Sequence, residues 1–151
     1  MALKHEDLYE ALGIVYDAIS EEKLNWHLNG SFNLLAQGMD IAVHDLDIET
    51  DEAGLLIFRE KLKEYIEEDR YRNEIEAHSL LLDIDGVQIE ILAHDNPDIA
   101  MVSDVKLINV EEMEIPVISY ENAKKFYRMV GMENKVKLIE EHIELLKSFE
   151  I

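Results

Sequence analysis

The sequence LNGSFNLLAQGMDIAVHDLDIE, residues 28–49, places a glycine bend, a short helix and an acidic strand in close succession. Asn29-Gly30 interrupts an apolar stretch, and glycine lets the backbone turn sharply and approach a ligand closely. Ser31 then begins a segment that can form two helical turns, with Gly38 as its C-cap. Free N–H groups at the start of such a helix, together with the Ser31 hydroxyl, favour a phosphate. A plain turn with Ser31 as an N-cap is the alternative.

The second half of this stretch predicts a strand with acids on one face. Asp45, Asp47 and Glu49 alternate with Leu46 and Ile48, so the three carboxylates share one side and the apolar residues face a core. Asp45 and Asp47 would lie ~6.6 Å apart along the strand. Two such carboxylates can share hard cations, and a pair of Mg²⁺ ions is the usual arrangement for phosphoryl transfer. The alternative is the exposed polar face of an antiparallel edge strand.

A β-hairpin is predicted over residues 78–84 and 87–93, because Asp85-Gly86 is a strong signal for a two-residue turn with positive φ. Glu90 then points away from the core side, on the same face as Asp83 and Gln88. If this strand lies beside the Asp45 strand, Glu90 completes a three-carboxylate cluster and can ligate a metal or accept a proton. An ordinary solvent-facing acid is the alternative. The register pairs apolar residues on the core face: Ile84 with Val87, Leu82 with Ile89, and Leu80 with Ile91.

The rest of the chain predicts an α+β fold with a mixed β-sheet packed with helices and a C-terminal helical segment. We expect one domain over residues 1–151, with a core over about 24–118 and C-terminal helices over about 120–149. The remaining elements predicted from apolar spacing are helices over 5–22 and 52–68, a half-buried strand over 24–28, extended segments over 106–110 and 115–118, and two final helices.

The composition restricts the possible partners. Fourteen Lys and Arg against 34 Asp and Glu give a formal net charge of −20, which disfavours nucleic acid and anionic membranes. Cationic small molecules, metal ions or a basic protein would be attracted. The absence of cysteine excludes disulfides and cysteine nucleophiles. With no apolar leader or membrane-length apolar run, a cytoplasmic location is expected.

Together these motifs resemble the polymerase-beta-like nucleotidyltransferase superfamily. Its pattern of a hydrophobic residue, Gly and Gly or Ser, then Asp-hydrophobic-Asp or Glu, is matched by Leu28-Asn29-Gly30-Ser31 and Asp45-Leu46-Asp47-Ile48, with Ile89-Glu90-Ile91 as the later acid. The stretch from Trp26 to Ala36 is similar to the minimal aminoglycoside- and lincosamide-nucleotidyltransferase branch. The tail keeps the basic residue of that branch at Lys135.

The resemblance implies Mg²⁺-dependent transfer of a nucleoside monophosphate from an NTP to a hydroxyl acceptor, which we expect to be a small molecule or a protein. It implies a two-ion site, in which Mn²⁺ could replace Mg²⁺. The implied roles are triphosphate binding for Gly30, Ser31 and Lys135, metal ligation for Asp45 and Asp47, and binding of the second metal or base catalysis for Glu90.

Two other functions remain open from the sequence. Asn29, Met132 and Val136 depart from the superfamily pattern, which would fit a catalytically inactive module that binds a partner protein. A metal-dependent phosphohydrolase could use the same three acids.

Overall fold

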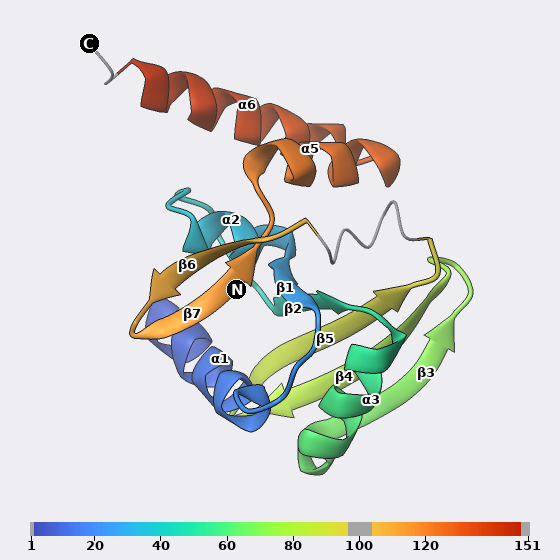
Figure 1. Cartoon of the computed structure of the whole chain (residues 1–151). Coiled ribbons are helices and arrows are strands. Elements are labelled where there is room, and N and C mark those ends of the chain that lie inside the picture. The colour runs from blue at the N-terminus through green and yellow to red at the C-terminus, as the bar shows by residue number, and fades with distance from the viewer. Residues whose placement is uncertain (1, 97–103, 149–151) are drawn as a thin grey trace.

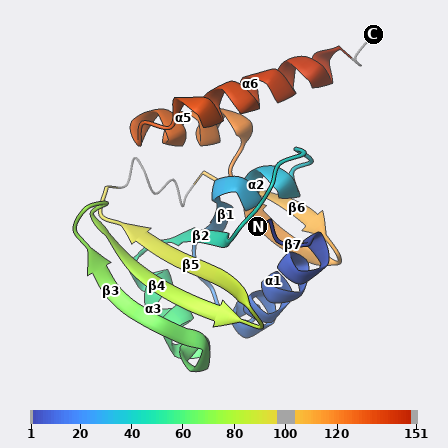
Figure 2. The same ribbon diagram turned by 180° about the vertical axis from the view of Figure 1, so that it is seen from behind.

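The computed structural model describes residues 2–96 and 104–148, and it has the expected α+β fold (Figure 1). A mixed five-stranded sheet has the strand order β1-β2-β5-β4-β3, which Figure 2 shows from behind, and β6 and β7 form a separate two-stranded sheet. The predicted helical tail reaches residue 149, which lies outside the described residues. The strands are β1 (Trp26–Asn29), β2 (Leu46–Thr50), β3 (Ile66–Arg72), β4 (Ala77–Ile84), β5 (Val87–His94), β6 (Lys106–Val110) and β7 (Met113–Val117).

Two helices cover one face of the sheet and form the main core with it. They are α1 (His5–Ile19) and α3 (Glu52–Lys61). Apolar residues of α1 such as Leu8 and Leu12 pack with Phe58 of α3 and with the inward-facing residues of β4 and β5. The predicted end of α1 at residue 22 lies three residues beyond its observed end at Ile19.

The C-terminal helices lie on the other side of the molecule from α1 and α3 (Figure 1). These are α5 (Tyr120–Met129) and α6 (Glu133–Lys147), and they pack on α2 (Gly30–Ala36). A second buried cluster joins the three helices, so the tail is held directly beside the glycine bend. Its members are Leu34, Met39, Ile118, Ala123, Tyr127, Val136 and Ile139.

The acidic strand β2 is an interior strand. It pairs antiparallel with β1 and parallel with β5, so the alternative of an exposed edge strand is wrong. The strand over 24–28 was expected to be half-buried, but every residue of β1 is buried, including His27 and Asn29. Strand β1 is at the edge of the five-stranded sheet, so its burial reflects the elements that lie against it, which include β7 and α2.

The hairpin prediction is confirmed in detail. Asp85 and Gly86 have φ values of 51° and 87°, as a type I′ turn requires. The observed β4–β5 register pairs Ile84 with Val87, Leu82 with Ile89 and Leu80 with Ile91.

The helix predicted over residues 52–68 is wrong at its end. Helix α3 stops at Lys61, a short 3₁₀ turn spans Lys63–Tyr65, and β3 begins at Ile66. The residues of β3, IEEDRYR, are exposed or half-buried and show no apolar alternation. The strand forms because its backbone pairs with β4 across a short turn, and backbone pairing by itself imposes no alternation of apolar and polar side chains. Within the described residues, no helix combines the length and apolar character needed to cross a membrane.

Candidate active site

Two of the predicted acids lie side by side on neighbouring strands, Asp47 near the start of β2 and Glu90 in the middle of β5. Asp47 is the Cα partner of Asn29 on β1 and of Glu90 on β5, so the three residues form one row across the sheet. Asp45 directly precedes β2. The parallel pairing of β2 and β5 therefore puts Glu90 beside the acidic strand.

The glycine bend lies against this row. Gly30 has a φ of 62°, a left-handed conformation that side chains disfavour. A Cβ atom at Gly30 would lie 2.5 Å from Oδ2 of Asp47, closer than real Cβ contacts allow. Glycine is therefore required here both by backbone conformation and by the close approach to Asp47.

Lys135 reaches the same bend from the C-terminal helix. Its Nζ donates a hydrogen bond of 3.0 Å to Oγ of Ser31, across 104 residues of sequence. Two of the departures from the superfamily pattern lie close by. Val136 is a buried core residue of α6, and Met132 lies in the wall of the same hollow.

A hollow of about 310 Å³ opens over these residues. Residues of the glycine bend, the acidic strands and the C-terminal helices all line this hollow. The sequence predicted these three segments but not that they lie together. Asp45 lies outside this lining. The wall is formed by Asn29, Gly30, Ser31, Asp47, Glu90, Leu92, Phe126, Tyr127, Met132 and Lys135.

The electrostatics of the site favour a cation. Burial raises the pKa of Asp47 to about 7, and the charges of Asp45 and Glu90 contribute to this rise. Burial and the charge of Glu90 also raise the pKa of Asp45, whereas the neighbouring His44 lowers it. Ionising all the carboxylates therefore costs free energy that a bound cation would offset.

Asp45 and Asp47 fit a magnesium ion by the chemistry of their oxygen atoms. Among the described residues, no three His, Asp or Glu side chains are grouped closely enough to hold a metal ion by themselves. Mg²⁺ in nucleotide sites is usually held by one or two carboxylates, with waters and substrate phosphates as the remaining ligands. The pair of aspartates beside the Gly30 bend matches that ligand set.

Glu90 is held by two residues that the sequence did not single out. Its Oε2 accepts hydrogen bonds from Nη1 of Arg72 at 2.9 Å and from Oγ of Ser79 at 2.8 Å. Arg72 could not be recognised from the sequence, because it ends β3, the strand that the sequence assigned partly to a helix. Tyr127 was also missed. Burial, with the nearby charge of Asp47, raises its pKa to about 12, so its hydroxyl keeps its proton.

A second hollow of about 600 Å³ adjoins the first and shares Glu90, Leu92 and Phe126 with it. Its wall combines carboxylates and apolar side chains, so it suits a molecule with both a cationic and an apolar part. Its lining residues are Arg72, Asn73, Glu74, Ile75, Glu76, Glu90, Leu92, His94, Phe126 and Val130.

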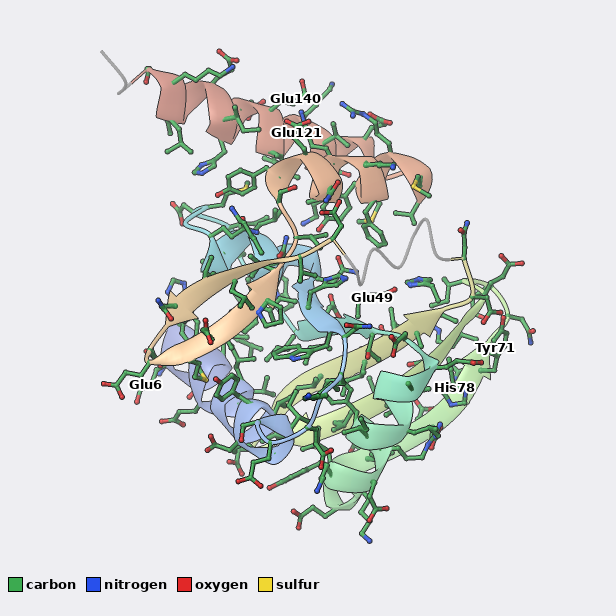
Figure 3. The ribbon with its side chains drawn as sticks, viewed as in Figure 1. Glu6, Glu49, Tyr71, His78, Glu121 and Glu140 are labelled. Carbon is green, nitrogen blue, oxygen red and sulfur yellow. The ribbon has the colours of Figure 1, made fainter. Side chains whose placement is uncertain are left out.

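A buried hydrogen-bonded pair adjoins the second hollow, which His94 helps to line. Glu49, the third acid of the β2 face, is completely buried and its Oε1 lies 2.6 Å from Nδ1 of His94. Figure 3 shows Glu49 inside the molecule, whereas Glu6, Glu121 and Glu140 project from helices at the surface. Burial raises the pKa of Glu49 to about 7, although the interaction with His94 opposes this.

The fold is that of the nucleotidyltransferase class. A candidate nucleotidyltransferase from Thermotoga maritima has a similar structure, with a TM-score of 0.76 and 25% sequence identity over 95% of this chain and 96% of that one.

The sequence also assigns the chain to one family within this class. The chain belongs to the aminoglycoside-2''-adenylyltransferase family, whose model matches residues 11–145. It is thus a member of an enzyme family that uses a nucleoside triphosphate. None of the curated proteins matches the chain.

Two more distant structures share the fold. The lincosamide antibiotic adenylyltransferase LnuA, bound to lincomycin, has a TM-score of 0.60 at 16% identity, over 93% of this chain and 98% of that one. The enzyme ANT(2'')-Ia, in complex with adenylyl-2''-tobramycin, has a TM-score of 0.59 at 11% identity, over 94% and 95% of the two chains.

Proposed function

We propose that the chain transfers a nucleoside monophosphate from an Mg²⁺-bound NTP to a hydroxyl group of a small molecule. The observation that carries this proposal is the row of Asp47 and Glu90 on paired strands beside the Gly30-Ser31 bend. We propose that the chain works as one domain, because the core over 24–118 supplies the acids and the helices over 120–149 supply Lys135.

In the proposed reaction, the N–H groups after Gly30, the Ser31 hydroxyl and the Lys135 ammonium bind the triphosphate. Asp45 and Asp47 would hold Mg²⁺, which neutralises charge on the phosphates when bound. The acceptor oxygen attacks the α-phosphorus, the bond from that phosphorus to the bridging oxygen breaks, and pyrophosphate leaves. Glu90 takes the hydroxyl proton. Positioning and charge neutralisation supply most of the catalysis in such transfers.

The second hollow is the proposed acceptor site. Carboxylates of Glu74 and Glu76 stand in its wall, and Arg72 in the same wall is already paired with Glu74 and Glu90. The ring of Phe126 offers an apolar surface beside these charges. The two distant structures carry lincomycin and an adenylylated tobramycin. We therefore propose a hydroxyl-bearing cationic small molecule as the acceptor.

The test follows α-³²P-labelled ATP, GTP, CTP and UTP with and without Mg²⁺. The acceptor panel contains tobramycin, lincomycin, simple amino alcohols and neutral polyols. We expect a labelled adduct with an aminated acceptor, lost in Asp45→Asn and Asp47→Asn and retained in Asp17→Asn, an exposed acid on α1.

Free nucleotide as the only labelled product would indicate a phosphohydrolase instead. Adducts with neutral polyols alone would refute the cationic acceptor. NTP binding that is equal in wild type and both aspartate variants, with no turnover, would refute the transferase assignment.

A further inference from the structure

Within residues 2–96 and 104–148, the hydrogen bonds to the Glu90 carboxylate reach one of its two oxygens, Oε2. Arg72 and Ser79 both donate to Oε2, at 2.9 and 2.8 Å. Among the described residues, no hydrogen bond to Oε1 is present. Two donors on the same oxygen restrict the rotation of the carboxylate, while no residue in the described part of the chain donates to the other oxygen.

The two donors come from the two strands beyond β5, on the face of the sheet that carries Glu90. Ser79 is buried on β4, so its hydroxyl has little freedom to move. Arg72 is the last residue of β3, and its side chain is 28% exposed. Its Nε is bound to Oε1 of Glu74 at 2.8 Å, so the guanidinium is held from both sides.

The charges around Glu90 make such an anchor necessary. Asp45 and Asp47 lie near enough that the negative charge of Glu90 raises the pKa of each. Like charges repel, so an unrestrained Glu90 side chain would turn away from the aspartates. Arg72 lies on the side of Glu90 away from the aspartates and compensates its negative charge. The repulsion that would turn the Glu90 side chain away is thereby reduced.

We infer that Arg72 and Ser79 are positioning residues for Glu90, holding Oε2 so that Oε1 faces the junction of the two hollows, where the acceptor hydroxyl loses its proton. This inference rests on the proposed function. It assigns Arg72 to the reaction rather than to acceptor binding, although Arg72 lines the larger hollow.

The test measures kcat and KM for pyrophosphate release from ATP with the best acceptor of the panel above. Loss of a hydrogen-bond partner that orients a metal ligand typically costs about 10- to 100-fold in activity, and we expect a similar factor for a partner that orients a base. We expect Arg72→Gln and Ser79→Ala to lower kcat by about that factor, with KM for ATP and acceptor within about threefold of wild type. Arg72→Lys keeps a donor and should retain more activity than Arg72→Gln.

Arg70→Gln is the matched control. Arg70 lies two residues earlier on β3, on the same face, and its ion pair with Glu68 is exposed. Its kcat should equal that of wild type. Far-UV circular dichroism and thermal unfolding show whether each variant is folded, and Ser79→Ala tests the inference separately if Arg72→Gln does not fold.

A double-mutant cycle with Glu90→Gln separates positioning from a structural role. If Arg72 acts through Glu90, Arg72→Gln causes no further loss once Glu90 is replaced. Losses that multiply in the double variant, or an unchanged kcat in both Arg72→Gln and Ser79→Ala, would overturn the inference while leaving the proposed function intact. A wild-type chain that releases no pyrophosphate with any NTP would overturn both.

Discussion

Replacing Asp47 by asparagine should stabilise the protein at alkaline pH, although it should abolish activity. Asp47 is half-buried between Asn29 and Glu90, and its pKa is raised from 3.8 to about 7. The folded protein therefore holds this proton more tightly than the unfolded chain. The contribution of the protonated Asp47 to the unfolding free energy is complete below about pH 4 and is lost as the pH rises to about 7.

The size of the effect follows from the shift in pKa. A difference of about three units corresponds to on the order of 4 kcal/mol at about pH 8, because each unit represents about 1.4 kcal/mol. At about pH 5.5 the same group costs only about 2 kcal/mol, since the folded form is still mostly protonated. The asparagine side chain of the variant does not titrate. The gain in unfolding free energy from Asp47→Asn should therefore be larger by about 2 kcal/mol at about pH 8 than at about pH 5.5.

The assay is urea unfolding followed by circular dichroism at both pH values, with EDTA present so that no cation offsets the charge. Asp17→Asn, an exposed acid of α1, is the control and should show no such pH dependence. Replacing the EDTA by millimolar Mg²⁺ should stabilise wild type more than Asp47→Asn. A gain that is the same at both pH values would refute the reasoning, because it would mean that the carboxylate is not desolvated in the folded protein.

Three further changes test other parts of the site. Gly30→Ala should lower the unfolding free energy by about 1–2 kcal/mol and impair NTP binding, because φ is positive and the new Cβ displaces Asp47; urea unfolding and ATP titration measure both. Lys135→Met should weaken ATP binding about tenfold, measured by calorimetry, since a charged phosphate contact is lost. His94→Ala should cost about 3 kcal/mol at about pH 8, because it leaves Glu49 buried without a partner. That cost should be smaller at about pH 6, where Glu49, with its pKa of about 7, can bind a proton.

These variants have controls within the chain. Gly13 lies inside α1 and a Cβ there would meet nothing within 4 Å, so Gly13→Ala should leave ATP binding unchanged. Lys137 is exposed on α6, and Lys137→Met should likewise not alter ATP binding. Partial recovery of stability in His94→Ala with Glu49→Gln would confirm that the cost comes from the unpaired acid. Full stability of His94→Ala at alkaline pH would contradict it.

The hairpin and the glycine bend were predictable because their signals are local. Asp85-Gly86 sets two positive φ values, and the alternation on either side fixes the register from the turn outward. Gly30 occupies a backbone conformation that few other residues tolerate, so its position in the sequence already indicated a bend.

The end of α3 and the strand β3 were not predictable in the same way. Tyr65 and Ile66 continue the apolar spacing of the preceding helix, yet Ile66 begins a strand. The charged residues that follow carry no alternation, because β3 is held by backbone pairing with β4. Arg72 was therefore missed as a partner of Glu90.

The sequence by itself determined which residues can turn, which can face a core and which carry charge, because these properties depend on each side chain and its neighbours along the chain. Only the tertiary structure decided that β2 lies parallel to β5, which sets Asp47 beside Glu90, and that α6 brings Lys135 to Ser31. It also decided the raised pKa of Asp47, since desolvation and repulsion depend on groups that meet only after folding.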